Sequence, residues 1–481
     1  MLKGFIRNIK PLEILTEEQI QAIHRGTLNV LETAGVRVEH DRALELFADH
    51  GCKVDSKKKR VRIPSYVAEE CLRKCPSIFR IRARDPKDDL MLGGNVMYYC
   101  QGAGMNYLDL DTWESRPATL QEHKEAIIVA DALDSVHMAM GWEFYMQMVD
   151  IAPCMTMLEG LASGIRNSTK TEMFGYGNDS EKFAIKMAKA VGMDLLGSAF
   201  LAPPLTMYGD TCDSAFSCAE ADFPVLALGG TVYGGTGPVT IAGTLVSYNA
   251  DIMSAIVLLQ LIKPGAKVTA WSFVHPLDMR SGYPVFGAVE SRLFDVAFHQ
   301  IWRKYGIPTG DVAGYSNSKK IDFQSGYERG MSALINAASG ANLQEFNGAV
   351  SMELTHSPVM TVLDDDIAGW IGRLIEGIQV TNETLAIDLI NEVGPIPGSY
   401  LTKEHTRKWW KKEQFRPKVA DRECYPEWIK SGKKDALALA KARVEEILAT
   451  HKPKPLTLEE NKAVDEVLEE ARSFYKQKGL M

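Results

Sequence analysis

Residues 223–275 read FPVLALGGTVYGGTGPVTIAGTLVSYNADIMSAIVLLQLIKPGAKVTAWSFVH. An apolar run at 224–230 is followed by a glycine-rich turn, a long helix-forming run at 244–263 and a second apolar run at 267–273. Short apolar runs on either side of a helix are typical of parallel strands joined by a crossover helix and buried on both faces. This stretch therefore predicts one strand–helix–strand unit of an α/β fold.

The same alternation repeats along the chain from Asn95. We expect strands at 96–101, 136–142, 171–176, 204–208, 224–230, 267–273, 308–314 and 342–348. Helices are expected between and after them, at 119–133, 153–167, 179–192, 212–221, 244–263, 286–305, 321–339 and 364–382. Eight successive units predict a (β/α)8 TIM barrel. A doubly wound sheet rarely has eight units, and no G-x-G-x-x-G follows the first strand, which argues against a Rossmann fold.

Two flanking regions complete the expected domain organisation. Residues 1–94 are predicted to form an N-terminal helical cap, with Thr16 as the N-cap of its first helix. The barrel at 95–382 is the expected catalytic domain, and 383–481 form a C-terminal helical extension. Three roles stay open for this extension: an arm that docks a partner, a brace exchanged between protomers, or a tail that packs on its own barrel.

Composition excludes several classes of protein. The formal net charge is -8 and no stripe of Lys and Arg is present, so we expect no nucleic-acid partner. The N-terminus lacks the apolar core of an export signal, and we expect no membrane span. The eight cysteines are irregularly spaced without a C-x-x-C, which predicts reduced thiols and no structural metal. We therefore expect a cytoplasmic protein.

The expected strand ends are rich in aromatic residues. The active site of a TIM barrel lies at the C-terminal ends of its strands, and seven of the eight expected ends carry an aromatic ring. Each single ring is equally explained by core packing, but together they indicate a mouth that binds a cation by its ring faces. The candidate substrate-binding rings are Tyr99, Trp142, Tyr176, Tyr208, Trp271, Tyr315 and Phe346.

Polar candidates lie near the same strand ends. Glu143 would either reinforce a bound cation or make a structural hydrogen bond. The other polar candidates for substrate binding are His275, His356, Asn317 and Gln344. Either histidine is also explained as a buried structural residue.

A glycine-rich loop after the fifth strand is the candidate cofactor-binding segment. Gly230, Gly234 and Gly235 would let a bulky group approach the backbone closely, whereas the ligands expected of a phosphate cradle are missing. Asp364, Asp365 and Asp366 resemble a metal cluster, but we expect them to open the last barrel helix, where carboxylates favour the positive end of the helix dipole. We expect no metal site.

Several sequence blocks carry a resemblance to a known family. They are PVTIAGTLVSYNADIMSAIVLLQLIKPGAKV within 223–273, ESRLFD at 290–295, GYSNSKKIDFQSGYE at 314–328, SGANLQ at 339–344 and ELTHSPVMTVLDDDIAGWI at 353–371. In these blocks, and over most of its length, the chain resembles the corrinoid-dependent trimethylamine methyltransferases. The resemblance implies a (β/α)8 barrel, transfer of a methyl group to the cobalt of a cognate corrinoid (cobalamin) protein, and a homo-oligomer.

The chain departs from the founding members of that family. Those enzymes carry pyrrolysine, whereas this chain contains only standard residues and has Asn317 where the family pattern more often has Asp. It therefore resembles the non-pyrrolysine branch, which implies a small quaternary amine as substrate, with glycine betaine as the first expectation and proline betaine or carnitine as alternatives. Demethylation of a quaternary amine expels a neutral tertiary amine, so alignment of the reacting atoms suffices and no catalytic side chain is expected.

Two further hypotheses come from other classes. A non-catalytic betaine-binding protein would also use an aromatic cage. A Schiff-base lyase would need a lysine at a buried strand end, and neither Lys267 nor Lys319 lies at such a position.

Overall fold

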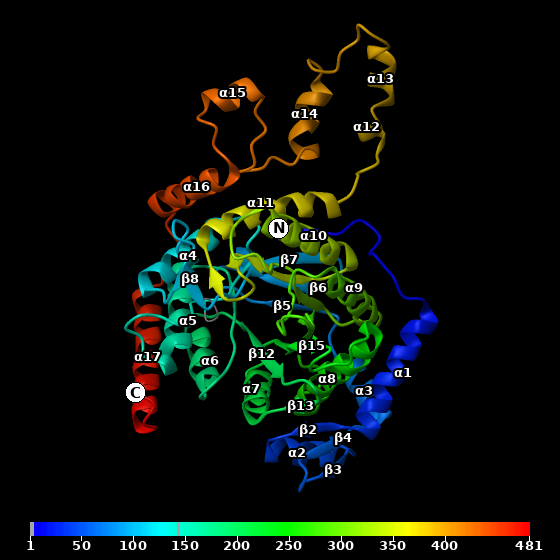
Figure 1. The fold of residues 1–481 in the computed structure, drawn as a ribbon, viewed down its shortest axis with the longest axis vertical. Helices are drawn as coiled ribbons and strands as arrows, with labels where there is room; N and C mark the ends of the chain where they lie inside the picture. Colours follow the sequence, from blue (N-terminus) through cyan, green and yellow to red (C-terminus); the bar gives the residue numbers. More distant parts are fainter. Residues whose placement is uncertain (1–3, 142–144) are drawn as a thin grey trace.

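A computed structural model describes residues 4–141 and 145–481. Eight parallel strands form a barrel, because the last strand pairs with the first (Figure 1). The barrel strands are β7 (Val96–Gln101), β10 (Met138–Ala139), β11 (Thr171–Met173), β12 (Leu195–Leu201), β14 (Val225–Gly229), β16 (Val268–Ser272), β18 (Thr309–Val312) and β19 (Leu343–Asn347). The predicted (β/α)8 TIM barrel is confirmed.

One helix follows each strand and covers the outside of the barrel. These helices are α4 (Leu120–Ala132), α5 (Thr156–Asn167), α6 (Ser180–Ala190), α7 (Gly209–Glu220), α8 (Ile241–Ile262), α9 (Val289–Lys304), α10 (Phe323–Ser339) and α11 (Pro358–Ile375). By length and composition alone, helix α8 could cross a membrane. It is nevertheless a core helix, because 83% of its most apolar window is buried inside the protein.

The fourth barrel strand is not where the sequence pattern placed it. The strand is β12, whereas the predicted segment 204–208 contains β13 (Thr206–Met207), which pairs outside the barrel with β2 (Val36–Val38). Strand β12 has the sequence LLGSAFL. Its small residues interrupt the apolar run that is typical of a buried strand, so the sequence pattern does not indicate a strand here. Gly197 is needed because a Cβ at this position would lie 2.4 Å from Sγ of Cys218 on α7.

Alternation along the strands separates two cores. Tyr98 and Cys100 of β7 belong to the cluster that fills the lumen, whereas Met97 and Tyr99 belong to one that packs against α10 and α11. The same lumen cluster includes side chains of the hairpin β5 (Ile78–Ile81) and β6 (Leu90–Gly93). This hairpin adjoins the start of β7, so the lumen is closed at the N-terminal ends of the strands.

The N-terminal region contains strands as well as the expected helices. Helices α1 (Glu17–Thr33) and α3 (Ser65–Lys74) pack against α8 on the outside of the barrel. A small sheet of β2, β4 (Arg60–Arg62), β3 (Lys53–Asp55) and β13 lies beside α2 (Asp41–Asp49). The edge strand β1 (Phe5–Ile6) runs antiparallel to β7. The boundary at residue 94 stays a prediction.

Short strands and 3-10 helices lie in the loops that connect the larger elements. Strand β15 (Thr231–Tyr233) pairs with β17 (Val274–Pro276). A second small sheet contains β8 (Asn106–Leu108), β9 (Ser115–Arg116), β20 (Ala349–Val350) and β21 (Thr355–His356). The 3-10 helices are η1 (Pro86–Asp88) and η2 (Pro153–Met155). All eight cysteines are free thiols.

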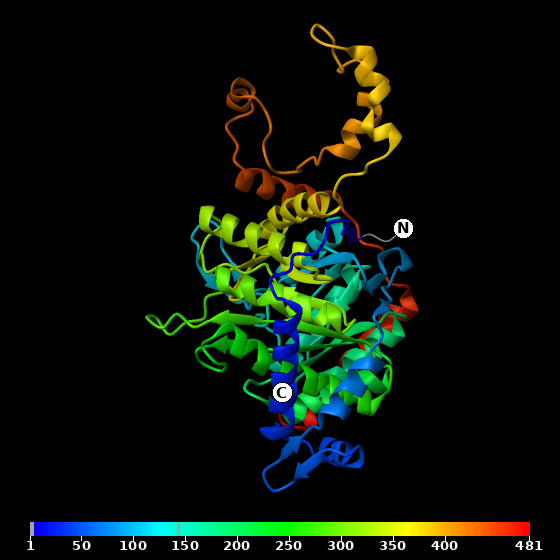
Figure 2. The same ribbon diagram turned by 90° about the vertical axis from the view of Figure 1, so that its right-hand side faces the viewer.

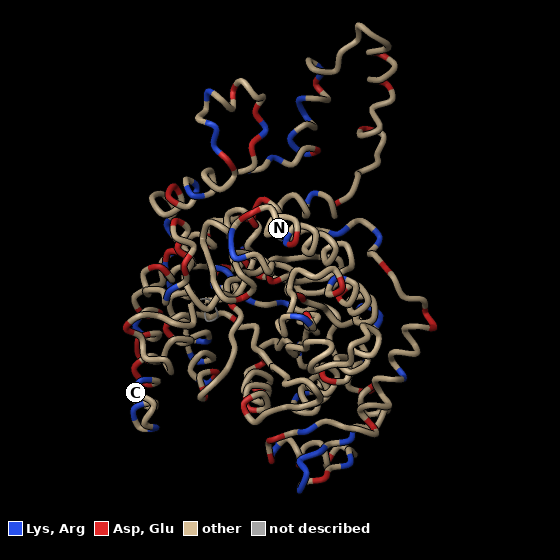
Figure 3. Tube along the Cα trace, in the orientation of Figure 1, with Lys and Arg blue, Asp and Glu red and all other residues tan. Residues whose placement is uncertain are grey.

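The C-terminal extension has two different parts. Helix α16 (Ala436–Thr450) packs on α11 and α4, and α17 (Leu458–Gln477) packs on α6 and α5. In contrast, α12 (Asn382–Leu385), α13 (Ile387–Val393), α14 (Glu404–Glu413) and α15 (Tyr425–Lys430) stand clear of the barrel in both views (Figures 1 and 2). The boundary at residue 382 stays a prediction. Charges of both signs are interspersed over the barrel (Figure 3), and the figure shows no basic stripe there.

Candidate active site at the barrel mouth

Partly exposed side chains lie at the C-terminal ends of the barrel strands, above the buried lumen. Phe200, Leu228, Phe273 and Met352 pack against the buried lumen cluster and are themselves partly exposed. They come from the ends of four different barrel units and form the solvent-facing rim of the lumen.

Four aromatic side chains gather just inside this rim, and we call them the ring cluster: Phe273, His275, Phe286 and Tyr315. The His275 and Phe286 rings lie 4.1 Å apart at 33°, and Phe273 meets His275 edge to face at 5.1 Å. The Tyr315 ring meets Phe286 edge to face at 5.6 Å. Phe273 is the partly exposed member, so it carries the face of the cluster that solvent reaches.

Backbone contacts fix the loops that carry the ring cluster. Oδ1 of Asn317 accepts hydrogen bonds from the backbone N–H groups of Phe286 (2.7 Å) and Gly287 (3.1 Å). Its Nδ2 donates to the carbonyl of Pro284 at 3.3 Å. Asn317 therefore joins the loop after β17 to the loop after β18. These bonds use both ends of its amide, so in this structure Asn317 is a positioning residue.

A carboxylate lies beside the ring cluster. The Tyr315 hydroxyl donates a hydrogen bond to Oε1 of Glu345 on β19, and the backbone N–H of Ala103 donates to the same oxygen at 2.9 Å. Leu343, two residues earlier on β19, is part of the lumen cluster, so Glu345 points to the same side. An acidic group thus lies within the ring-lined end of the lumen.

His275 is a neutral ring in this environment. Burial, together with the nearby charge of Arg292, holds the pKa of its imidazole well below the usual range. Its Nδ1 lies 3.3 Å from Oγ of Ser291, and its buried Nε2 has no hydrogen-bond partner. The indole Nε1 of Trp271, a lumen residue on β16, is likewise buried without a partner. Two polar nitrogens near the mouth are therefore left for a ligand.

A buried ion pair holds the last two strand ends together. Arg329 on α10 pairs with Asp364 on α11 and also donates to the carbonyls of Gly314, Phe346 and Ala349. Asp364 in turn accepts from the backbone N–H of Gly348 at 2.8 Å. Burial raises the pKa of Asp364 to about 6, although Arg329 opposes the shift.

The three consecutive aspartates are structural, but not for the expected reason. Helix α11 begins at Pro358, so Asp364, Asp365 and Asp366 lie inside the helix instead of opening it. Asp365 accepts from the backbone N–H of Ser135 at 2.9 Å, and Asp366 accepts from that of Lys418 at 2.7 Å. They anchor neighbouring segments. Among the described residues, no group of three or more His, Cys, Asp or Glu side chains could hold a metal ion.

The structure brings part of the predicted set together. Trp271, His275 and Tyr315 lie in or beside the ring cluster, and Asn317 supports it. Tyr176 lies at the rim, where its ring packs at 5.5 Å from Phe200 and its hydroxyl donates to the Phe200 carbonyl at 2.9 Å. The role of each in substrate binding stays a prediction.

Five predicted residues do not lie at the mouth as expected. Tyr99, Gln344 and Phe346 point outward to the helix layer, because Tyr99 and Phe346 pack in the α10–α11 cluster and Gln344 donates to the Ala333 carbonyl on α10. Tyr208 is 53% exposed at the N-cap of α7, because its segment is not a barrel strand. His356 is buried in β21 against Tyr145, and burial lowers its pKa to about 3.

Two more predicted residues, Trp142 and Glu143, lie outside the described residues. The loop glycines Gly230 and Gly235 are exposed, and Gly234 has a positive φ of 88° that a side chain rarely adopts. An added Cβ at Gly234 would also lie 2.5 Å from Cε of Met279. This glycine is therefore required by the loop itself, and its contact with a cofactor stays a prediction.

Sequence reasoning did not select Phe200, Phe273, Phe286 and Glu345. Phe273 and Glu345 could have been found, because each lies two residues from an inward-pointing residue on the same strand, Trp271 and Leu343 respectively. Phe200 was hidden by the misplaced fourth strand. Phe286 follows a long loop, and no sequence signal marks it as part of the site.

The sequence of this chain is similar to that of a known protein family. The sequence matches the trimethylamine methyltransferase (MTTB) family over residues 1–473. The chain belongs to this family. Its members are methyltransferases, and so is this chain, which removes the non-catalytic alternative and the Schiff-base alternative.

Characterised relatives cover nearly the whole chain. A trimethylamine methyltransferase MttB from Desulfitobacterium hafniense is 30% identical over 96% of this chain and 94% of its own length. A glycine betaine methyltransferase from another strain of that species is 32% identical over 92% of this chain and 94% of its own length. Among solved structures, the monomethylamine methyltransferase of Methanosarcina barkeri is 10% identical, with a TM-score of 0.48, and covers 97% of this chain and 95% of its own.

Proposed function

We propose that this methyltransferase transfers a methyl group from a small quaternary amine, in the first place glycine betaine, to the cobalt(I) of a cobalamin carried by a cognate corrinoid protein. The tertiary amine dimethylglycine would be released. The observation that carries the proposal is the ring cluster with Glu345 beside it at the mouth of the barrel. Similarity to the glycine betaine methyltransferase supports the same substrate class.

The electrostatics of this mouth suit a permanent cation. A ring face attracts an ammonium group by about 0.5–2 kcal/mol, more when the site is shielded from water. A carboxylate at Glu345 adds attraction for the same charge. Because burial keeps His275 neutral, its imidazole adds a ring without adding positive charge. A trimethylammonium group has no N–H to donate, so ring faces bind it better than hydrogen-bond acceptors do.

The carboxylate end of a betaine needs donors at the opposite side. We assign this role to Nε2 of His275 and Nε1 of Trp271, because both are buried and lack partners in the absence of a ligand. A neutral imidazole donates from one nitrogen only, so this role requires the proton to be on Nε2 and Nδ1 to accept from Ser291. Proline betaine and carnitine present the same two groups with more volume between them, and they remain alternatives.

Methyl transfer requires access from one side only. The corrinoid protein would supply cobalt(I) as the nucleophile at the mouth, since the hairpin β5–β6 closes the other end of the lumen. The C–N bond breaks with its electron pair left on nitrogen, so the departing amine is neutral and the protein donates no proton. The residues of this chain bind the ammonium, orient one methyl outward and exclude water. We propose that Gly230, Gly234 and Gly235 lie beside the approaching corrin ring.

Binding of an analogue that lacks only the ammonium charge tests the cation site directly. Isothermal titration would compare glycine betaine with 3,3-dimethylbutanoate, in which carbon replaces the quaternary nitrogen at nearly the same size. We expect betaine to bind at least tenfold more tightly. Equal affinity for the two would show that the mouth recognises shape and carboxylate alone, and would contradict the proposal. We further propose that the chain acts in the cytoplasm as a homo-oligomer.

A further inference from the structure

The segment 378–434, which we call the arm, lacks a core of its own. Not one residue of helices α12 to α15 is buried. Eleven of the 33 exposed large apolar side chains among the described residues lie between Ile378 and Ile429. The most exposed are Ile378 (86%), Ile396 (95%) and Leu401 (82%). Apolar side chains gathered at this density on a protruding segment mark an interaction surface.

The arm is nevertheless folded as a unit. Helix α14 lies along the α12–α13 segment, because Lys403 pairs with Glu392 at 2.7 Å and Lys408 pairs with Glu383. At its base, Arg422 donates to the Phe415 carbonyl at 2.9 Å, and the backbone of Lys418 and Ala420 donates to Asp366 of α11. The arm is therefore held at its root and bare along its length (Figure 2).

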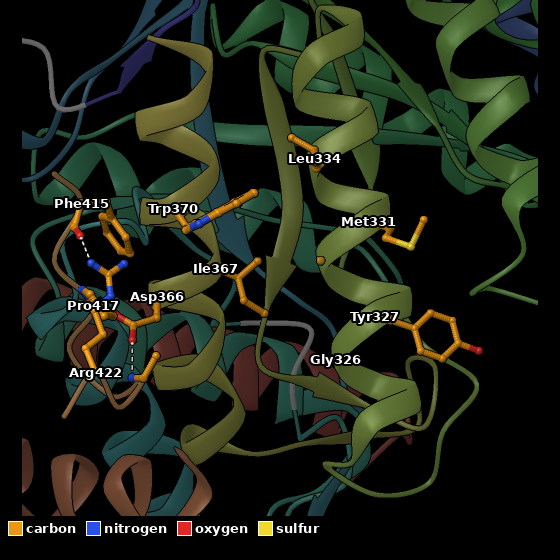
Figure 4. Close-up of a pocket in the computed structure, with 12 residues that line it drawn as sticks. Gly326, Tyr327, Met331, Leu334, Asp366, Ile367, Trp370, Phe415, Pro417 and Arg422 are labelled. Atoms are coloured by element: carbon orange, nitrogen blue, oxygen red, sulfur yellow. Dashed lines mark hydrogen bonds between the residues drawn. The ribbon is translucent and has the colours of Figure 1, made fainter. Parts of the chain in front are cut away.

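An apolar hollow of about 540 Å³ adjoins this root. It lies between α10 and α11 and is lined by Tyr327, Met331, Leu334, Ile367, Trp370 and Phe415 (Figure 4). Tyr327, Met331 and Trp370 are about half exposed. The outer face of a barrel helix ordinarily carries polar side chains, so this face also lacks a partner.

The arm joins the barrel near both ends of helix α11. Helix α11 ends at Ile375, whose carbonyl accepts from the N–H of Asn8, and the preceding Phe5 pairs with Met97 at the start of β7. The chain returns from the arm at 435–437, which line a hollow with Ile321 and Met360 near the N-terminal ends of α10 and α11, on the mouth side. The arm therefore spans the length of α11, and a second copy of this chain carries the same pair of bare surfaces, an arm and a hollow, that the first copy presents.

We infer that the arm of one copy packs on the α10–α11 hollow of a second copy, and the reverse, in a two-fold interface. A dimer with one two-fold axis would bury the arm and the hollow of both copies, because each copy supplies one arm and one hollow. The eleven exposed side chains present on the order of 1,000 Å² per copy, comparable to the roughly 800 Å² that each partner of a standard interface buries. This inference rests on the proposed homo-oligomer and names its surface.

Sedimentation velocity of the full chain at micromolar concentration tests the inference. We expect the wild-type chain to sediment as a dimer or a multiple of dimers. The arm variant Ile396→Glu/Leu401→Glu and the hollow variant Met331→Glu should each sediment with about half the wild-type mass or less. The control variant Leu458→Glu places a charge at an equally exposed leucine (91%) at the start of α17, and it should assemble like the wild type.

Each outcome decides a separate point. Circular dichroism and Tm confirm that all variants are folded, since the substituted residues are exposed. A monomeric wild-type chain would overturn both the oligomer and its surface, and loss of methyl transfer to the corrinoid protein in the arm variant would then assign the arm to that partner. An assembled wild type whose mass neither variant changes would overturn the surface alone. None of these results depends on which amine is the substrate.

Discussion

The phenol of Tyr315 donates a hydrogen bond to the carboxylate of Glu345, and both side chains point into the mouth of the barrel. The two residues belong to adjacent barrel units: Tyr315 follows β18, and Glu345 lies on β19. The hydrogen bond therefore sets the edge-to-face contact of Tyr315 with Phe286 and holds a negative group beside the ring cluster. The Tyr315–Glu345 pair is therefore stronger support for a cation site than any single ring is.

Removal of the Glu345 charge should weaken binding of the cation. We expect Glu345→Gln to lower the affinity for glycine betaine about 5- to 30-fold, since a carboxylate near a partly desolvated ammonium contributes on the order of 1–2 kcal/mol. Titration calorimetry measures the change, and 3,3-dimethylbutanoate, which carries the carboxylate but no ammonium charge, serves as the control whose affinity should not fall. Equal loss for both ligands would assign Glu345 a purely structural role.

Phe273 and Phe346 provide a matched pair of rings, one at the mouth and one in the helix layer. Phe273→Leu should weaken betaine binding about 2- to 30-fold, the range of one cation–π contact, with little change in Tm. Phe346→Leu should lower Tm, because this ring is fully buried between the barrel and α10–α11, and leave affinity nearly unchanged in the folded protein. The opposite pattern would contradict the inward and outward assignment of these rings.

His275 predicts how betaine binding depends on pH. Its pKa is held well below 6.5 in the folded protein, so it stays neutral and betaine affinity should be flat from pH 6 to 8. Because the folded state resists protonation, His275 contributes stability that is present above the unfolded pKa near 6.5 and is lost as pH falls below it. A fall in affinity with a midpoint near 6.5 would show that His275 titrates normally.

The buried pair Arg329–Asp364 should dominate the stability of the last two barrel units. Arg329→Met leaves Asp364 buried without its partner and should cost roughly 3–5 kcal/mol, measured by urea unfolding. The double variant Arg329→Met/Asp364→Leu should recover part of that loss, because the uncompensated charge is gone. If the double variant is as unstable as the sum of both single changes, the ion pair is not the main support of this region.

The barrel and the alternation of its units could be predicted from the sequence, because β14, α8 and β16 follow an unambiguous apolar pattern. The fourth strand could not. Strand β12 contains the small residues Gly197, Ser198 and Ala199, which give it a weak apolar pattern, and the close contact with Cys218 requires the glycine at 197. The neighbouring segment at 204–208 has a stronger pattern but pairs with β2 of the N-terminal region.

The candidate site was predictable only in part, because the side on which a strand residue lies depends on register. If the register of a strand is assigned one residue off, every side chain moves from the lumen to the helix layer or the reverse. In the observed register, Tyr98 and Glu345 face the lumen, whereas their neighbours Tyr99, Gln344 and Phe346 face the helices. Trp271, His275 and Tyr315 were found since their strand ends were correctly placed. Phe286 is brought to the site by the loop that Asn317 fixes, a tertiary contact with no local signal.

Methyl transfer to cob(I)alamin tests the central claim most directly. Glycine betaine, proline betaine, carnitine and trimethylamine would be supplied side by side to the purified chain with reduced cobalamin or its corrinoid protein, and methylcobalamin would be followed by its absorbance. We predict transfer from glycine betaine, with a clear margin over trimethylamine, and its loss in Glu345→Gln or Phe273→Leu. Transfer from trimethylamine alone, or from none of the four, would contradict a mouth built for a permanent cation.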